Sequence, residues 1–343
     1  MTRSALAVLA LGGNALITTD QVGTQREQLR NARRAAGAIV TLARSGFRVL
    51  VVHGNGPQVG RELLRNEESS TKIPPHSLDV CVAATQGTMG FLLALETANA
   101  LRRVQLKTPV SPVMTQVLIN PEDAAFQNPT KPIGPFYNNW RAKALMKTEG
   151  VHMVEDAGRG WRRVVASPPP LEVLNLDSVE ALLSAGHIVI AGGGGGVPVA
   201  VDPKGQLTGV EAVVDKDRTA AMLAGDLGAE LLVLLTGVDQ IYANFGRTDQ
   251  SPLERVSVVE LRALYEAGQF PPGSMGPKVE SALEFVEDGG VQAIITSAAK
   301  FAAALADRAG TRIAAVADEG APMRRQISLF PPLSDDENDD DDA

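Results

Sequence analysis

Six short apolar runs recur along the chain and constrain its fold more than any other feature. They are mostly continuous rather than alternating, which is typical of strands buried on both faces of a parallel sheet. The stretches between them have helical patterns, such as residues 26–46, which end on a glycine as many helices do. Strands that alternate with helices predict an α/β fold with a mainly parallel sheet. The predicted strands are 5–11, 47–53, 112–119, 187–193, 230–237 and 291–297.

Charge is distributed very unevenly along the 343 residues. The last ten residues, SDDENDDDDA, carry seven acids and no base, so the net charge of −8 becomes −8 − (−7) = −1 for the rest. We interpret this end as a disordered acidic tail. The nearly neutral body lacks the clustered basic face of nucleic-acid-binding proteins, so we expect no nucleic-acid partner. With 44% apolar residues, the body can bury a sizeable core.

Cysteine, histidine and hydropathy patterns further limit the class of protein to which this chain can belong. A single cysteine, Cys81, excludes an intramolecular disulfide and suits a reducing cytoplasm; we interpret it as a small buried side chain. The four histidines lack metal-site spacing, so no metal site is predicted. Glycines interrupt the N-terminal apolar stretch after Leu11, and no apolar stretch reaches the roughly 20 residues of a membrane span. We therefore expect a cytoplasmic protein without membrane association.

One region departs from the alternation of strands and helices. After QNPTKPIGPFY (127–137) come a short helical pattern and then two β-rich pieces joined by Asp-Ala-Gly-Arg-Gly, which indicates a hairpin. A helix and hairpin inserted between parallel strands predict a small flap over about 127–167. Such flaps often exclude water from a reaction, although a surface insertion without that role fits the pattern equally well.

Glycine-rich turns follow three of the predicted strands. Ligands of open α/β sheets bind beyond the carboxyl ends of the strands, where turns of this kind present backbone N–H groups to anions. Neither the dinucleotide pattern G-x-G-x-x-G nor the P-loop pattern occurs. The turns are Gly12-Gly13-Asn14, Gly54-Asn55-Gly56 and the five glycines 192–196.

Lys131, Lys216 and Lys278 lie in glycine-rich, proline-rich or otherwise weakly charged settings. Lysine suits phosphate oxygens, and phosphoryl transfer needs mainly positioning and charge neutralisation. Asp215 and Asp217 flank Lys216, so a charge cluster at a helix N-terminus without a chemical role is an alternative. The residues alone predict an α/β protein that binds a phosphorylated ligand.

The order of seven motifs resembles the carbamate kinases of the amino-acid-kinase superfamily. The motifs are LALGGNAL, VVHGNGPQVG, FQNPTKPIGPFY, AGGGGGVPV, GVEAVVDKD, TGVDQIYANFG and GSMGPKVE, and the resemblance runs from about Ala5 to Ile313. It implies a three-layer αβα sandwich over 1–314 that includes the flap, and a homodimer, whereas the extension over 315–343 lies beyond the region of resemblance. It also implies the Mg²⁺-dependent reaction of ATP and carbamate to ADP and carbamoyl phosphate, often run toward ATP synthesis in the breakdown of arginine or related compounds.

The resemblance also implies roles for individual residues. Lys131 would reach carbamoyl phosphate, Lys216 would stabilise the transferring phosphoryl group, Asp217 would orient Lys216, and Lys278 would hold the nucleotide phosphates. The carbamate and the phosphoryl group would be held by Gly12, Gly13, Asn14, Gly54, Asn55 and Gly56. The nucleotide pocket would include Gly194, Gly195, Asp239, Tyr242, Met275, Pro277 and Lys278.

Two positions depart from the family pattern, and two other functions compete with it. Gln240 replaces an expected glycine and Gly237 an expected aspartate near the nucleotide pocket, which bears on base preference. A related kinase that forms another acyl phosphate from a different small acceptor is one alternative. A catalytically weak nucleotide-binding sensor that acts through its tail is the other. The joint presence of the three lysines and Asp217 argues against the sensor.

Overall fold

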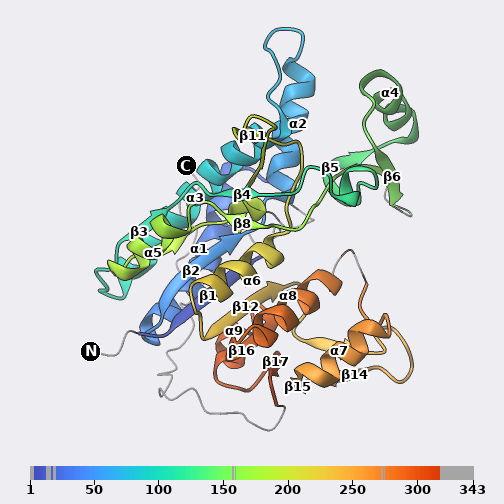
Figure 1. The fold of residues 1–343 in the computed structure, drawn as a ribbon. Coiled ribbons are helices and arrows are strands. Elements are labelled where there is room, and N and C mark those ends of the chain that lie inside the picture. Colours follow the sequence, from blue (N-terminus) through green and yellow to red (C-terminus); the bar gives the residue numbers. More distant parts are fainter. Residues whose placement is uncertain are drawn as a thin grey trace, which may run out of the picture.

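The computed structural model describes residues 4–12, 17, 21–156, 158, 160–271, 273 and 275–316. A large sheet of eight strands dominates these residues, with helices on both of its faces (Figure 1). Its strands are β1 (Leu6–Leu11), β2 (Arg48–His53), β3 (Val110–Pro112), β9 (Ile188–Ile190), β12 (Leu231–Thr236), β15 (Arg255–Ser257), β16 (Gln292–Ser297) and β17 (Thr311–Ala314). They lie in the order β15-β17-β16-β12-β1-β2-β9-β3, and only β16 and β17 pair antiparallel. The predicted three-layer αβα sandwich with a mainly parallel sheet is confirmed.

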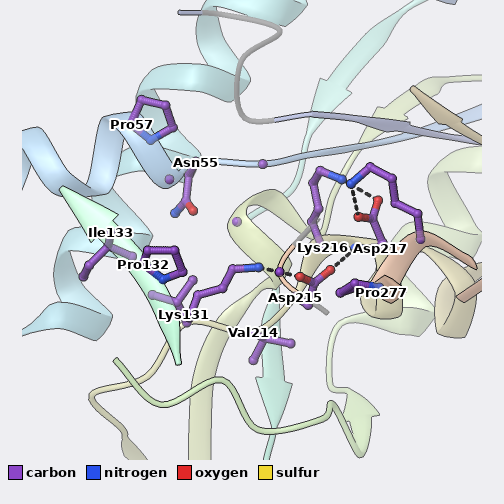
Figure 2. A pocket seen from close by; sticks show the side chains of 16 residues that line it. Asn55, Pro57, Lys131, Pro132, Ile133, Val214, Asp215, Lys216, Asp217 and Pro277 are labelled. Carbon is purple, nitrogen blue, oxygen red and sulfur yellow. Dashed lines mark hydrogen bonds and ion pairs between the residues drawn. The ribbon is translucent and has the colours of Figure 1, made fainter. Parts of the chain in front are cut away.

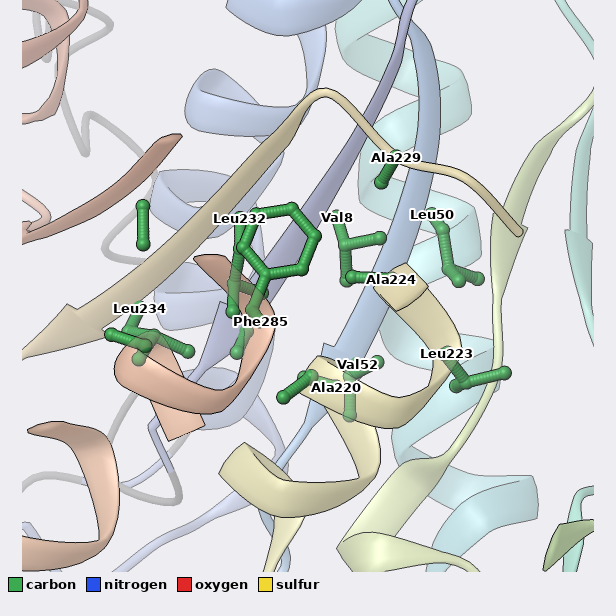
Figure 3. Packing of buried hydrophobic residues seen from close by; sticks show 14 of the residues in the cluster. Val8, Leu50, Val52, Ala220, Leu223, Ala224, Ala229, Leu232, Leu234 and Phe285 are labelled. Carbon is green, nitrogen blue, oxygen red and sulfur yellow. The ribbon is translucent and has the colours of Figure 1, made fainter. Parts of the chain in front are cut away.

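Alternate residues of the sheet belong to two separate cores. On β1, Leu6, Val8 and Ala10 face one core and Leu9 faces the other, which explains why the strand reads as a continuous apolar run. Figure 3 shows the first core, where Val8 and Leu232 lie near Phe285. That core is covered by α5 (Leu176–Ser184), α6 (Lys216–Asp226), α7 (Val258–Glu266) and α8 (Gly276–Glu287). The second is covered by α1 (Gln25–Arg44), α3 (Leu78–Arg103) and α9 (Phe301–Leu305).

The predicted strand at 112–119 is wrong as a single element. The segment divides between β3 of the main sheet and β4 (Gln116–Leu118) of a second sheet, which has the order β11-β10-β4-β8. Between them the Thr115 N–H donates to the side chain of Gln86 at 2.8 Å, so the backbone leaves the first sheet there. The remaining strands of the second sheet are β8 (Glu172–Val173), β10 (Val197–Val201) and β11 (Leu207–Gly209).

The helix and hairpin predicted within 127–167 are present, together with a third strand. Strand β5 (Lys131–Tyr137) was not predicted, because two prolines and a glycine interrupt it, but proline is tolerated at the edge of a sheet. It pairs with the hairpin of β6 (Met153–Asp156) and β7 (Gly160–Val165) in the order β5-β7-β6. Helix α4 (Asn139–Glu149) completes the flap, which projects from the body beside α2 (Gly56–Ser69) in Figure 1.

Helix α3 is an exception to the expectation that no apolar stretch is long enough to span a membrane. It has 26 residues and is long and apolar enough to cross a membrane by length and composition, although half of its most apolar window is buried inside the fold. It packs against α1 and the second core, as a core helix does. The short elements that remain are β13 (Ile241–Ala243), β14 (Ser251–Leu253), η2 (Ala124–Phe126) and η3 (Gly193–Gly195). Residues 317–343, which include the predicted acidic tail, lie outside the described residues.

The flap approaches the body through a contact between two glycines. A Cβ atom on Gly60 of α2 would lie 2.1 Å from the Cα atom of Gly134 in β5, which is backbone and cannot rotate away. We expect Gly60→Ala to displace the flap and to lower the free energy of unfolding by about 1–3 kcal/mol, the usual cost of overpacking. Urea denaturation measures this change. Gly37→Ala is the matched control.

Gly37 lies inside α1, and a Cβ atom there meets nothing within 4 Å. Because alanine favours helix more than glycine does, the control should gain up to about 1 kcal/mol. Equal stabilities for Gly60→Ala and the wild type would contradict the close contact.

Candidate active site

The carboxyl ends of β1, β2, β9 and β12 meet at one edge of the main sheet, because these strands are parallel neighbours. The turns that follow β2 and β9 line a cavity of about 230 Å³ there, together with β5 and the first residues of α2, α6 and α8 (Figure 2). Its lining residues are Gly54, Asn55, Gly56, Pro57, Lys131, Pro132, Ile133, Gly194, Val213, Val214, Asp215, Lys216, Asp217, Gly273, Pro277 and Lys278.

The glycine run after β9 has a conformation that other residues would not tolerate. Gly194 and Gly195 have φ angles of 67° and 88°, which favour glycine. A Cβ atom on Gly194 would lie 2.3 Å from Nδ2 of Asn55, and one on Gly195 would lie 2.2 Å from the carbonyl oxygen of Val214. The run therefore packs its backbone directly against the turns on either side.

Three lysines and two aspartates form two groups of ion pairs, which a backbone hydrogen bond between the aspartates joins. Asp215 caps α6 by accepting the Asp217 N–H at 2.9 Å, and its other carboxylate oxygen pairs with Lys131 of the flap. Asp217 pairs with Lys216 through one oxygen and with Lys278 through the other, at 3.0 Å. Figure 2 shows these contacts across the cavity. Asp215 is therefore the N-cap of α6, as a helix N-terminal charge cluster predicts, and the two aspartates also pair with all three lysines.

Burial and pairing change the acidity of this set. Burial lowers the pKa of Lys216, and the nearby Asp217 carboxylate opposes that shift. Burial would raise the pKa of Asp215, but Lys131 and Lys216 outweigh it and hold that pKa well below its ordinary value. Three ammonium groups against two carboxylates leave the cavity with an excess of positive charge, which suits an anionic ligand.

The structure brings most of the predicted site residues to this cavity, and it leaves some of them outside the lining. Asp239 accepts a hydrogen bond from Ser297 Oγ at 2.6 Å beyond β12, and the ring of Tyr242 lies 6.2 Å from that of Phe245. Gly12 follows β1 and Met275 precedes α8. The predicted residues outside the lining are Gly12, Gly195, Asp239, Tyr242 and Met275. Gly13 and Asn14 lie outside the described residues.

Several polar residues beside the cavity were not found by sequence reasoning. Thr85 and Gln86 of α3 bind the turns after β2 and β9, and Thr219 of α6 donates to the Gly195 carbonyl at 2.8 Å. They lie inside helices and match no motif of the sequence, so no local signal identified them.

Comparisons with known proteins show the family to which the chain belongs. The model of the amino acid kinase family matches residues 5–297. The carbamate kinase of Thermococcus kodakarensis is 44% identical over 309 residues, covering 89% of this chain and 98% of that protein. Carbamate kinase 2 of Enterococcus faecalis is 46% identical over 294 residues, covering 85% and 93%. A structure of carbamate kinase from Giardia lamblia bound to AMP-PNP has a TM-score of 0.84 at 38% identity, covering 92% of this chain and 99% of that one.

The chain belongs to the carbamate kinases of the amino acid kinase family. The resemblance inferred from the seven motifs is thereby confirmed.

Within this carbamate kinase fold, His53 lies at the end of β2 directly below the glycine turns. Its side chain is fully buried, and burial lowers its pKa from 6.5 to about 4. The ring is therefore neutral at pH 7. Its Nδ1 atom lies 3.1 Å from the Gly54 carbonyl oxygen, which can only accept, so we assign the ring proton to Nδ1. His53 thus supports the turn and does not itself carry charge.

This burial predicts a pH-dependent stability. The unfolded chain binds a proton at His53 below about pH 6.5, whereas the folded protein does not until about pH 4. The stabilisation is complete above pH 6.5 and decreases as the pH falls toward 4, by about 3 kcal/mol in total. His53→Asn keeps an N–H donor and does not titrate, so its unfolding free energy should fall less over this range. Urea melts at several pH values measure both proteins, and parallel curves would contradict the assignment.

Proposed function

We propose that the chain catalyses the reversible transfer of a phosphoryl group between ATP and carbamate, giving ADP and carbamoyl phosphate. The observation that carries the proposal is the convergence of Lys131, Lys216 and Lys278, from three separate elements, on one glycine-lined cavity. A loose phosphoryl-transfer transition state spreads negative charge over several oxygens, and fixed cations and N–H donors stabilise it. The relatives named carbamate kinase cover nearly the whole chain and support the same reaction.

Each lysine has a separate task in this proposal. Lys131 binds carbamoyl phosphate from the flap side, Lys216 stabilises the transferring phosphoryl group, and Lys278 holds the nucleotide phosphates. Asp217 positions Lys216 and Lys278 at once, because its two oxygens bind one lysine each. Carbamate is itself a nucleophile, so the reaction needs positioning rather than a general base. The backbone of the turns at Gly12, Gly13, Asn14, Gly54, Asn55 and Gly56 supplies hydrogen bonds to the carbamate and phosphoryl oxygens.

The nucleotide occupies the side of the site formed by the turn after β9, the end of β12 and the start of α8. The AMP-PNP named in the Giardia lamblia structure supports a nucleotide site in this fold. The residues proposed to line it with Lys278 are Gly194, Gly195, Asp239, Tyr242, Met275 and Pro277.

In this proposal ATP or ADP would carry Mg²⁺ into the site. Among the residues the structure describes, no group of three or more His, Cys, Asp or Glu could hold a metal ion. The carboxylate oxygens of Asp215 and Asp217 already accept bonds from lysines and from a backbone N–H. Magnesium usually keeps several waters and binds through substrate phosphates, so the donor set fits a metal carried by ADP or ATP. Bound there, Mg²⁺ would neutralise phosphate charge.

The setting of the enzyme follows from the family resemblance alone. We propose a cytoplasmic homodimer that produces ATP from carbamoyl phosphate during the breakdown of arginine or a related compound. Its amino-acid-kinase domain spans 1–314, and 315–343 form an appended tail.

Replacement of Lys216 tests the catalytic assignment. We expect Lys216→Ala to lower the rate of ATP formation from Mg-ADP and carbamoyl phosphate by at least 10²–10³-fold, the order seen when a group that stabilises a developing anion is removed. Circular dichroism should show an intact fold. A luciferase assay measures the rate, and Lys204→Ala, at an exposed turn, is the control. Rates near those of the wild type would remove Lys216 from the chemistry. An inactive but folded wild-type protein would instead favour another acyl acceptor or a sensor.

Replacement of Lys131 separates the two substrates. Because Lys131 belongs to the flap and Lys278 to α8, we expect Lys131→Ala to raise the KM for carbamoyl phosphate about tenfold or more, with little change in the KM for ADP. Initial rates at varied concentrations of each substrate give both constants. An equal rise in the two KM values would contradict a role specific to carbamoyl phosphate.

A further inference from the structure

Two adjacent residues of α3, Thr85 and Gln86, hold the two glycine turns that form one wall of the cavity. Their side chains are almost fully buried, with 1% and 5% exposure. Successive residues of a helix point about 100° apart, so neighbours on α3 can reach different turns. Thr85 reaches the turn after β2, and Gln86 reaches the turn after β9.

The hydroxyl of Thr85 has a fixed orientation. It donates to the Val82 carbonyl of its own helix at 2.7 Å, and it accepts from Nδ2 of Asn55 at 2.9 Å. Asn55 lines the cavity and is itself 2% exposed. Because the hydroxyl proton is donated to the helix backbone, the hydroxyl oxygen can only accept from Asn55. The direction of its lone pair therefore determines where the Asn55 amide lies.

Gln86 makes one hydrogen bond to the other turn and two to Thr115. Its amide nitrogen donates to the Gly193 carbonyl at 2.9 Å and to the Thr115 carbonyl at 3.0 Å, and its amide oxygen accepts the Thr115 N–H at 2.8 Å. Thr115 in turn accepts the Gly192 N–H at 2.9 Å through its hydroxyl. The five glycines have no side chains with which to hold their own shape. Gln86 and Thr115 therefore fix the run from outside.

We propose that Thr85 and Gln86 are positioning residues that act on different substrates. Thr85 acts through Asn55 on carbamoyl phosphate, and Gln86 acts through Gly193 and Gly194 on the nucleotide. This inference rests on the proposed function, because it uses the two halves of that site. A side chain that serves only the stability of α3 would affect both substrates alike, whereas two separate positioning roles give separable effects.

Thr85→Val removes the hydroxyl and keeps the shape of the side chain. We expect it to raise the KM for carbamoyl phosphate about fivefold to tenfold, as expected for one lost hydrogen bond in a buried site, and to leave the dissociation constant of ADP within about twofold. Thr85→Ser retains the hydroxyl and should restore the wild-type KM. Thr88→Val, the same change at an exposed position of α3, is the matched control.

Gln86→Met should show the reverse selectivity. It removes both donors and the acceptor, so we expect the dissociation constant of ADP, measured by calorimetry, to rise about tenfold while the KM for carbamoyl phosphate changes by no more than about twofold. Gln86→Glu keeps only the oxygen that accepts the Thr115 N–H, and we expect the same rise in the dissociation constant of ADP. This variant takes the place of Gln86→Met if Gln86→Met fails to fold. Gln206→Met, at an exposed strand-connecting turn, is the control.

The pattern across the variants decides the proposal. The proposal is supported if the Thr85 variant loses affinity only for carbamoyl phosphate and the Gln86 variant only for ADP, and if these losses do not correlate with the melting temperatures. Parallel losses for both substrates, or no loss in either, overturn it. Calorimetry with ADP needs no turnover. A wild-type protein that binds ADP without forming ATP would therefore refute the proposed reaction. The Gln86 variants would still test whether Gln86 positions the nucleotide.

Discussion

Burial of the main sheet on both faces is the constraint on which the site depends. Because β1 sends alternate side chains into two different cores, neither face of the strand is free to carry functional groups. Chemistry is therefore displaced to the ends of the strands. The parallel arrangement then places the carboxyl ends of β1, β2, β9 and β12 at the same edge, where backbone turns meet.

The ion pairs at that edge connect elements that are far apart in sequence. Lys131 comes from the flap, Lys216 from the start of α6 and Lys278 from the start of α8. Asp215 pairs with the first and Asp217 with the other two, and the Asp217 N–H donates to Asp215. An aspartate at the cap of α6 is favourable for the helix by itself. The same short segment thus begins the helix and fixes the positions of cations that would repel one another if left alone.

Sequence reasoning predicted what depends on local pattern. Five of the six apolar runs contain strands of the main sheet, and the hairpin of the flap follows from its turn residues. It failed where tertiary contacts decide the outcome. The run at 112–119 divides because Thr115 binds a residue from α3, and β5 forms in spite of its prolines because it pairs at an edge. Tyr242 and Met275 match family motifs and lie outside the cavity lining, so their place in the nucleotide pocket stays a prediction.

Helix α3 shows why such a site cannot be read from composition. Its apolar content is high enough for a membrane span, yet Thr85, Gln86 and Glu96 are buried within it. A buried polar side chain is costly unless its hydrogen bonds are satisfied, and Gln86 satisfies its own with backbone groups of two distant segments. Those segments are the ones that lack side chains of their own to hold their shape. A glycine-lined anion site therefore requires polar residues elsewhere in the core, and their positions become evident only when the fold brings the partners together.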